Sequence, residues 1–473
     1  MSHYSDNGDP KIANSKTTLQ PQNRSRLPVD SKFLQMMKAN WQFDTKPKLI
    51  DSSLKSAAKI HRDELWSNFS NQTLVIDAGS LKVRSNDTDY KFRPASAFSH
   101  LTGLGQDYDP EAKLVFYPTN SSYTAVLYIR PPYDLTSDKF YSNSYYGEFW
   151  IGSRPKLIDF ANATGLTTKS LSDYAKDIKS QKFILTLQDP QLLEVTDQLR
   201  LIKLPEEIKQ LKKAVAVTKK GFEAVIKQLD KAKLYDRAER YLEGVFHQQA
   251  ITLGNQEGYE TIVAAGHHAT ILHWIRNTGQ IKDGELLLLD AGCEVDSLYT
   301  ADITRTMPIS GSFSTAQKDI YNLVLKAANA GFTKAKPGNK FIDVHNAAMR
   351  EIAQGLIDLG ILKISLDEVL DKQLHRRWMC HGTSHHLGID VHDCDHVKKD
   401  GYINGTLKEG MVFTIEPGLY FKTFDNLIPD IYKGIGIRIE DDVLITKNGC
   451  ENLSQDFPRD AQSVENWVIN LKN

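Results

Sequence analysis

The sequence predicts a protein of mixed α and β structure with two folded domains, the second built around a mainly antiparallel sheet. Its 473 residues exceed one ordinary core, at a prior of about 150 residues per domain. Before residue 200, short β-rich runs are interleaved with helical patterns, as in an α/β domain. After it, amphipathic helices are followed by stretches that alternate like antiparallel strands.

The composition is that of an ordinary globular chain, with 41% hydrophobic and 25% charged residues. The 58 Lys and Arg nearly balance the 59 Asp and Glu, which argues against nucleic acid or an anionic membrane as the main partner. No apolar run approaches the ~20 residues that cross a bilayer, and the N-terminus has no signal or transit pattern. The 4 scattered cysteines fit a reducing compartment. We therefore expect a cytoplasmic protein.

The first part of the chain is predicted to contain a flexible tail and then an α/β domain. Residues 1–30 are polar with almost no large apolar side chains, which favours a flexible tail. Helical spacing of apolar residues covers 33–66. The segment 84–94 is polar, aromatic and too long for a simple turn, so it is either a functional loop or a solvated one. The β-rich runs predict strands at 73–77, 113–117 and 124–129.

A helix start marks the expected domain boundary. Pro205 at an early helical position, with Glu206 and Glu207 in the first turn, is typical of a helix N-terminus. The boundary is placed just before it, which gives a first domain over 31–203 and a second over 204–473. In the second domain we expect further helices over 236–253, 314–335 and 342–359, and antiparallel alternation over 260–312 and 378–450.

A buried strand that ends on an acid carries the first functional signal. The leucines at 286–289 predict a buried strand, and Asp290 follows directly. A carboxylate in an apolar interior is too costly unless it is paired, hydrogen-bonded or bound to metal. Asp302 lies in a second β-rich segment. The two acids could clamp a divalent cation, or Asp302 could simply pair with Arg305.

A histidine cluster is the second signal. His381, His385, His386 and His392 lie within twelve positions and are interspersed with glycines. Glycines favour a tight loop whose backbone approaches something closely, rather than one helical stripe. A lone buried histidine is usually a core residue. Four together predict a site, because neutral imidazole is both a metal ligand and a proton carrier.

Two further acids complete the pattern. Glu416 is expected at the end of a strand, because Pro417 cannot continue a central one. Alternation places Arg438, Glu440 and Asp442 on one strand face, for which a solvated face is the alternative.

Together these residues form a set of four carboxylates and one imidazole. Oxygen-rich ligation with one nitrogen favours manganese, iron, cobalt or zinc, and four negative charges suit two ions better than one. A two-metal site that ionises water and polarises a carbonyl points to hydrolysis. The set is Asp290, Asp302, His385, Glu416 and Glu440.

In their residues and in their order along the chain, these motifs resemble those of the metallopeptidases with the pita-bread fold, and within that group those of the aminopeptidase P family. The resemblance covers essentially everything after residue 200, and it implies a curved, mainly antiparallel catalytic domain after an α/β domain of the creatinase/prolidase type. The first domain is similar to the family's N-terminal domain at Arg-Ser-Asn-Asp-Thr-Asp-Tyr (84–90) and Phe-Arg-Pro-Ala-Ser (92–96). The later motifs are Asp-Ile-Thr-Arg-Thr at 302–306, Glu-Pro-Gly-Leu-Tyr at 416–420 and Gly-Ile-Arg-Ile-Glu-Asp-Asp at 436–442.

The resemblance implies two divalent metal ions, with manganese expected. Asp290 would bind the first ion, and His385 with Glu416 would bind the second. Asp302 and Glu440 would bridge both, and Glu416 would also take the proton of the bridging water. The interval from Asp290 to Asp302 is one residue longer than in the best-known bacterial members, and the extra residue falls in the intervening turn, around 296–298.

The resemblance also implies roles around the metal ligands. His273 matches a substrate-side histidine, and His381 and His392 match the histidines that hold the substrate and stabilise the tetrahedral intermediate. Arg438 would orient Glu440 from outside the ligand shell.

The implied activity is release of an N-terminal residue before proline, with a metal-bridging hydroxide as nucleophile. The expected partners are peptides with proline in the second position and other copies of the chain in a dimer or tetramer. Prolidase, a dipeptidase for Xaa-Pro, shares the ligand set and is the alternative. The short 420–434 connection disfavours it. A metal-free binding or scaffold relative is a more distant alternative, against which the complete ligand set argues.

Overall fold

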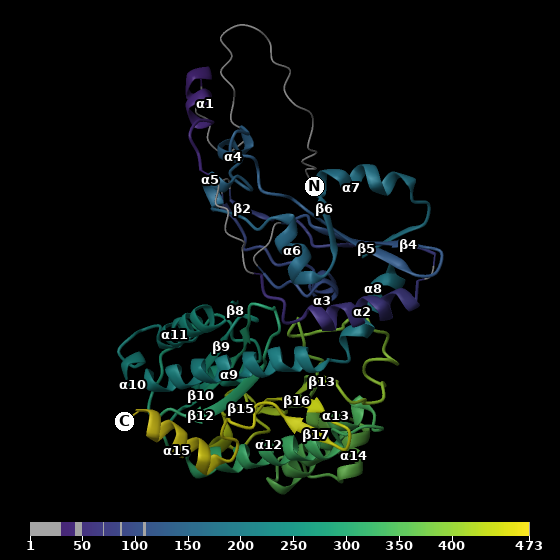
Figure 1. The fold of residues 1–473 in the computed structure, drawn as a ribbon. Helices are drawn as coiled ribbons and strands as arrows, with labels where there is room; N and C mark the ends of the chain where they lie inside the picture. Colours follow the sequence, from purple (N-terminus) through teal and green to yellow (C-terminus); the bar gives the residue numbers. More distant parts are fainter. Residues whose placement is uncertain (1–29, 43–49, 70, 86–87, 107–109, 473) are drawn as a thin grey trace. The chain divides into compact units, whose positions relative to one another are not determined.

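A computed structural model describes residues 30–42, 50–69, 71–85, 88–106 and 110–472. The predicted tail therefore lies outside the described residues, apart from Asp30. The chain forms two compact units, and each is described by itself (Figure 1). The second unit takes in two short early segments, 56–69 and 99–105, together with everything from Leu187 onward. The predicted division at 203/204 stays a prediction.

The first unit is built on a five-stranded mixed sheet, in the order β6-β5-β4-β1-β7. The central strands pair antiparallel, whereas the edge strands β6 and β7 run parallel to their neighbours. The three predicted strands are confirmed, but the edge strands were missed because they are short and partly exposed. The strands are β1 (Thr73–Asp77), β4 (Lys113–Pro118), β5 (Tyr123–Ile129), β6 (Thr167–Ser170) and β7 (Ile184–Thr186).

The rest of the described chain before residue 187 forms short elements. The predicted loop over 84–94 contains part of a hairpin formed by β2 (Val83–Ser85) and β3 (Thr88–Asp89). The helical pattern over 33–66 corresponds to two helices, α1 (Ser31–Met37) and α2 (Lys55–Ser67), of which α2 lies almost entirely in the second unit. The other helices before residue 187 are α3 (Ser96–Thr102), α4 (Lys139–Ser142), α5 (Glu148–Ile151), α6 (Leu157–Thr164), α7 (Leu171–Asp177) and η1 (Ile178–Ser180).

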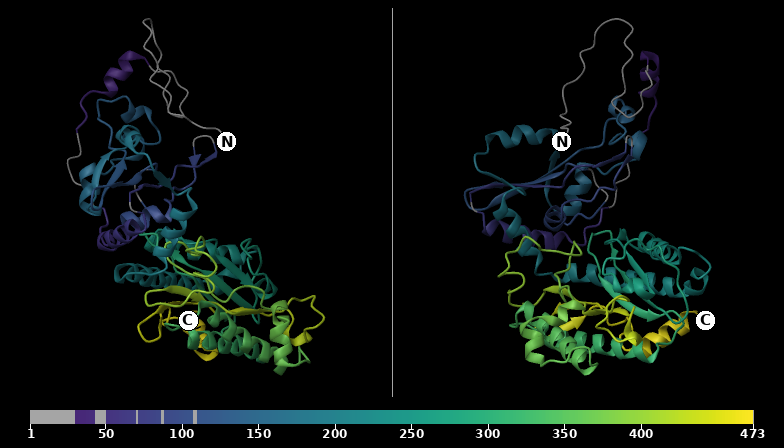
Figure 2. Two further views of the ribbon diagram at one scale, coloured as in Figure 1. Left: turned by 90° about the vertical axis from the view of Figure 1, so that its right-hand side faces the viewer. Right: turned by 180° about the vertical axis from the view of Figure 1, so that it is seen from behind.

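In the second unit, the long helix α9 (Pro205–Lys227) begins where the sequence predicts. The Glu207 carboxylate accepts the Leu204 N–H at 2.7 Å, which satisfies a free donor at the helix N-terminus. Helices α9 and α11 lie on one side of the strands, and α12 and α13 on the other (Figures 1 and 2). The remaining helices are α8 (Pro190–Arg200), α10 (Leu229–Ala232), α11 (Ala238–Leu253), α12 (Thr315–Lys334), α13 (Phe341–Asp358), α14 (Leu366–Asp371) and α15 (Ala461–Lys472), with short η2 (Gly266–Thr270), η3 (Leu374–Arg377) and η4 (Asp430–Tyr432).

All named strand pairs of the second unit are antiparallel, as predicted. They form the sheets β12-β10-β9 and β13-β16-β17 and the ribbons β11-β8 and β14-β15. The strands are β8 (Gln256–Glu257), β9 (Ile262–Ala265), β10 (Leu286–Ala291), β11 (Cys293–Glu294), β12 (Ile303–Pro308), β13 (Val412–Ile415), β14 (Gly418–Tyr420), β15 (Gly436–Arg438), β16 (Asp441–Ile445) and β17 (Cys450–Asn452).

Two details differ from the sequence prediction. Within the described residues 378–411 there is no regular strand, only isolated bridges, because the glycines and polar residues there form turns around the histidines. The segment 436–445 is not one strand but two, and Glu440 lies in the break between β15 and β16. In both places the polar side chains, including the histidines and Glu440, do not follow the alternating in-and-out pattern of a regular strand.

In the described part of the chain, each helix is either too short or too polar to span a bilayer.

Candidate metal centre

The predicted site residues meet in one place. A cavity of about 550 Å³ in the second unit is lined by every one of them. A larger cavity, about 1230 Å³, shares residues 381, 382 and 384 with it but contains none of the predicted ligands. The smaller cavity is therefore the candidate site. Its lining includes His273, Asp290, Asp302, His381, His385, His392, Glu416, Arg438 and Glu440.

Two neighbouring strands deliver Asp290 and Asp302. Asp290 belongs to β10, where it pairs with Thr304 of β12, and Asp302 immediately precedes β12. The turn between them closes with Leu298 in the left-handed region, at φ +72°, and Val295 N–H donates to the Tyr299 carbonyl at 3.0 Å. The lengthened turn therefore leaves both carboxylates at the cavity.

The histidine loop is fixed by hydrogen bonds to β13. His385 N–H donates to Thr414 Oγ1 at 3.2 Å, and Thr414 N–H donates to the His385 carbonyl at 3.0 Å. As a result His385 Nε2 lies 3.2 Å from Asp302 Oδ2 and 3.6 Å from Glu416 Oε1. The ring of His392 stacks on that of His385 with centroids 4.0 Å apart.

Three of the five predicted ligands already form a compact donor set. Asp302, His385 and Glu440 each offer one ligand atom, and these atoms lie within 4.8 Å of one another. Glu416 lies next to this set through its contact with His385, and Asp290 is linked to Asp302 through the Tyr259 hydroxyl, which contacts a carboxylate oxygen of each. The five groups are thus joined around one centre.

Arg438 is connected differently from the expectation. Its guanidinium contacts Asp290 directly, donates to the Tyr420 hydroxyl at 3.0 Å and reaches Glu440 only through Thr304. Thr304 Oγ1 in turn donates to Glu440 at 2.6 Å. Arg438 therefore orients Asp290 first and Glu440 indirectly.

The proposed pairing of Asp302 with Arg305 is not formed. Arg305 is fully buried, donates to Asp441 at 2.6 Å and also donates to the carbonyls of Glu440 and Pro458. Asp302 is left to face the cavity. The simple ion-pair explanation of this acid therefore does not hold.

Two contributors carried no sequence signal that could single them out. Tyr259 precedes β9 and lies against Asp290 and Asp302 only because the sheet folds it there. Glu239, at 0% exposure on α11, accepts hydrogen bonds from Ala265 N, His268 Nδ1 and Trp274 Nε1, each at 2.8 Å. It also accepts one from Gly279 N at 2.5 Å, so it fixes both ends of the segment that carries His273.

The pKa values of the buried carboxyl groups indicate that the centre needs positive charge. Burial raises the pKa of Asp290, although Arg438 opposes this, and burial with Asp302 raises the pKa of Glu440 well above its usual value. Burial raises the pKa of Glu416 to about 7, against the opposing effect of His385. Four buried carboxylates cannot all be ionised without compensating positive charge. The donor set therefore fits divalent metal.

The histidines differ in charge. Burial lowers the pKa of His385, but hydrogen bonding and attraction to Asp302 and Glu416 outweigh it and raise the value to about 9. Burial, with Arg438, lowers the pKa of His381 to about 3, and burial, with His385, lowers that of His392 to about 4. His381 and His392 are therefore neutral near pH 7, and His381 Nε2 lies 2.8 Å from the Tyr420 hydroxyl.

In metal-free protein the contribution of Glu416 to stability is expected to fall as pH rises from about 5 to 7, whereas the lowered pKa values of His381 and His392 act in the opposite direction below pH 6.5. The folded-state pKa of Glu416, about 7, exceeds its usual 4.5, so the native state holds more protons in this window and the free energy of unfolding falls as pH rises. For Glu416 alone the loss is on the order of 3 kcal/mol. The raised pKa of His385 acts in the same direction between its usual 6.5 and about 9.

Thermal melting of chelator-treated protein at pH 5 and pH 8 checks this expectation. Because the histidines titrate in both proteins, the comparison is between wild type and Glu416→Gln. The melting temperature of wild type relative to that of the variant should be lower at pH 8 than at pH 5, and added divalent metal should remove most of this change. A difference between the two proteins that stays constant or grows with pH would contradict the expectation.

Comparison with known proteins assigns both parts of the chain. Residues 209–447 match metallopeptidase family M24, and residues 58–184 match the aminopeptidase P N-terminal domain. The chain belongs to family M24. Among its relatives in the family, Xaa-Pro aminopeptidase 1 of Streptomyces coelicolor is 39% identical, with 94% of this chain and 93% of that protein covered. Xaa-Pro aminopeptidase of Escherichia coli is 32% identical, with 84% and 93% covered.

Solved structures agree with this M24 membership. Aminopeptidase P from E. coli with the inhibitor Pro-Leu superposes with a TM-score of 0.76 at 29% identity, covering 88% of this chain and 99% of that one. A zinc-substituted form of the E. coli enzyme in complex with product gives 0.75. The resemblance to aminopeptidase P is confirmed, as is the mixed α/β fold with a pita-bread second domain. Family membership also makes this chain a metallopeptidase that uses divalent metal.

Proposed function

We propose that this chain is a metal-dependent Xaa-Pro aminopeptidase, which hydrolyses the bond between an N-terminal residue and a following proline. The observation that carries the proposal is one cavity lined by all five predicted ligands together with His273, His381 and His392. The names of the M24 relatives point to the same activity. The proline nitrogen in such a bond has no N–H to donate, and the proline ring fixes the backbone φ angle. A peptidase that binds its substrate as a hydrogen-bonded β-strand therefore binds these peptides poorly.

We propose two divalent ions in the centre, with manganese as the expected metal. Asp290 would hold the first, His385 and Glu416 the second, and Asp302 with Glu440 would be shared. Such ions supply Lewis acidity, which polarises a carbonyl and acidifies water. Support comes from the acid-rich donor set, because hard oxygen ligands with one imidazole suit manganese better than thiolate-seeking metals.

Proton transfer and substrate binding are assigned to side chains of this protein. Glu416 is the proposed proton acceptor, because it follows β13 directly and its carboxylate lines the cavity beside His385. Neutral His381 and His392 each carry one ring N–H that can donate a hydrogen bond to the substrate carbonyl. His273 is proposed on the substrate side. Arg438 and Tyr420 form a rigid support beneath Asp290 and His381.

Prolidase, the dipeptidase alternative, needs a group that binds the free carboxylate after proline. The two lysines of the 420–434 connection are both engaged: Lys422 donates to the Thr270 carbonyl, and Lys433 pairs with Asp430 at 2.7 Å. That connection has no arginine. This favours an aminopeptidase, in which the peptide continues beyond the proline.

Peptide length separates these two activities experimentally. We expect kcat/KM for Ala-Pro-Ala-Ala to exceed that for Ala-Pro by tenfold or more, because each about 1.4 kcal/mol of added transition-state contact gives a factor of ten. The two peptides are assayed side by side with manganese present. Lys422→Ala is a useful control and should not abolish dipeptide turnover. Cleavage confined to the dipeptide would establish a prolidase.

The scaffold alternative requires a centre without metal. Four buried carboxylates with no cation would be an unfavourable arrangement to retain. Elemental analysis of wild type beside the Asp302→Ala/Glu440→Ala variant decides between these possibilities, since a scaffold would carry no metal that these two substitutions remove.

We also infer a homo-oligomer, a dimer or tetramer, in the cytoplasm. Support for an interface comes from α5 in the first unit, where Phe149, Trp150 and Ile151 are each about half exposed. Adjacent large apolar side chains of this kind are typical of association surfaces. Light scattering would show a monomer if this is wrong. The proposed division into a tail over 1–30, an N-terminal domain over 31–203 and a catalytic domain over 204–473 is tested by limited proteolysis.

A further inference from the structure

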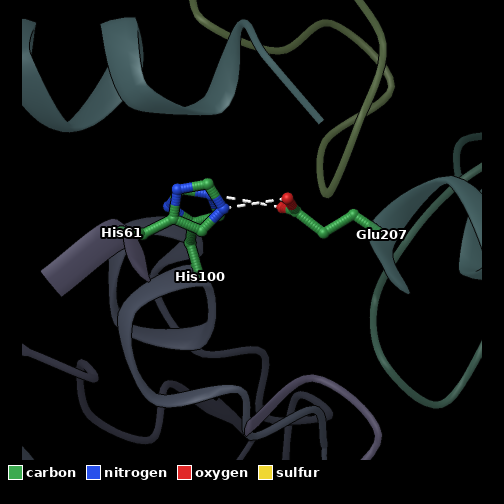
Figure 3. A group of neighbouring side chains, drawn as sticks. All are labelled: His61, His100 and Glu207. Atoms are coloured by element: carbon green, nitrogen blue, oxygen red, sulfur yellow. Dashed lines mark hydrogen bonds and ion pairs between the residues drawn. The ribbon is translucent and has the colours of Figure 1, made fainter. Parts of the chain in front are cut away.

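A second group of metal-binding side chains lies outside the candidate centre. His61 of α2, His100 of α3 and Glu207 of α9 point toward one another from three separate helices (Figure 3). Their exposures are 2%, 5% and 2%, and all three belong to the second unit. None has a part in the proposed reaction.

The geometry of the group is that of a preformed ligand set. His61 Nε2 lies 2.8 Å from Glu207 Oε2, and His100 Nε2 lies 3.3 Å from Glu207 Oε1. The two imidazole rings are close to stacked, with centroids 3.9 Å apart. One ligand atom from each residue lies within 4.8 Å of the others. Ligand atoms about 2.0–2.1 Å from a tetrahedral ion are roughly 3.3 Å apart, so little movement is needed to admit one.

Hydrogen bonding accounts for only part of the group. His61 Nε2 can share a proton with Glu207, and His100 Nε2 lies 3.3 Å from the same carboxylate, whereas Nδ1 of each ring has no hydrogen-bond partner among the described residues. A buried imidazole nitrogen without a partner is costly. Burial, together with His61, lowers the pKa of His100 to about 4, so its ring is neutral and has a free lone pair. In the tautomer with the proton on Nδ1, this lone pair lies on Nε2, beside the Glu207 carboxylate, where it could coordinate a cation.

The carboxylate is held in position from behind. Leu204 N–H donates to Glu207 Oε2 at 2.7 Å, and the Tyr299 hydroxyl donates to Oε1. Hydrogen bonds of this kind orient carboxylates that bind metal. The helix N-terminus disfavours a cation slightly, but this effect is small beside three ligand bonds.

The nearby arginines are engaged elsewhere and do not neutralise Glu207. Arg62 donates to the Leu101 carbonyl at 2.7 Å. Arg200 pairs with Asp393 at 2.9 Å and with Asp197 at 2.5 Å. Neither arginine therefore neutralises the Glu207 carboxylate, and a bound cation would do so.

We propose that His61, His100 and Glu207 form a separate structural metal site, which takes a transition-metal ion of the zinc class. Two imidazoles and one carboxylate are a donor set that zinc accepts in tetrahedral geometry, with a fourth position for the Tyr299 oxygen or water. The ion would join α2 and α3 to the N-terminus of α9. Its role is stability, because none of the three residues lines the candidate metal centre.

The test removes the catalytic metals first. A variant carrying both Asp302→Ala and Glu440→Ala is loaded with zinc, desalted and analysed by mass spectrometry for metal per chain. We expect about one ion to remain. Adding His100→Gln should remove it and lower the melting temperature, whereas His247→Gln, at an exposed histidine paired with Glu257, should retain it.

Cobalt loading covers the case in which the His100 variant does not fold. The folded Asp302→Ala/Glu440→Ala protein should show the visible absorption of a tetrahedral cobalt centre. No retained zinc and no cobalt band, or an ion count unchanged by His100→Gln, would mean a hydrogen-bonded cluster only and would overturn the proposal. Peptidase activity is not the readout, so this result is independent of the proposed function.

Discussion

Glu416→Gln is expected to leave the fold intact and to remove nearly all turnover. The amide cannot take a proton, and it is also a weaker metal ligand, so one change affects two functions. General-base catalysis alone contributes about 10²–10⁴-fold, and the lost ligand adds to this. The side chain is presented directly after β13, where its N–H donates to the Thr383 carbonyl at 2.8 Å, so the backbone should keep its position.

The measurement is kcat/KM for an Xaa-Pro peptide at saturating manganese, with melting temperature as the check on folding. Glu409→Gln is a matched control, because Glu409 is exposed in the segment before the same strand. Activity within tenfold of wild type would rule out Glu416 as the proton acceptor.

The second large effect is expected for the shared acids. If Asp302 binds both ions, Asp302→Ala should lose both together rather than one, and Glu440→Ala should behave in the same way. Asp302 lies between His385, at 3.2 Å, and Tyr259, which links it to Asp290, so its removal opens both halves of the centre. Activity should fall to background.

Elemental analysis of metal-loaded protein, dialysed under identical conditions, measures this effect. Asp296→Ala is the control, since Asp296 is exposed in the turn between the two acids and should leave the count unchanged. Metal bound at the separate His61, His100 and Glu207 site is excluded from the count by repeating the measurement in the His100→Gln background. A catalytic centre that holds one ion in wild-type protein would be incompatible with two-metal chemistry.

The sequence by itself determined the elements with strong local patterns. The leucines at 286–289 required a buried strand and placed Asp290 near its end, as in β10 (Leu286–Ala291). Pro205 with the acids after it set the start of α9. Pro417 set the end of β13 and so presented Glu416. Each signal is local, because backbone periodicity and capping depend on neighbours a few residues apart.

Only the tertiary structure decided how these pieces meet. Arg438 reaches Asp290 across 148 positions, and Tyr259 lies against two acids that no local pattern connects with it. The break that frees Glu440 from the strand alternation arises because β15 and β16 pair with different partners, β14 and β13. His61 and His100 are likewise isolated histidines until α2, α3 and α9 bring them to Glu207. Periodicity encodes which face of an element is buried, whereas the partner on that face depends on packing between distant segments, which no stretch of sequence specifies alone.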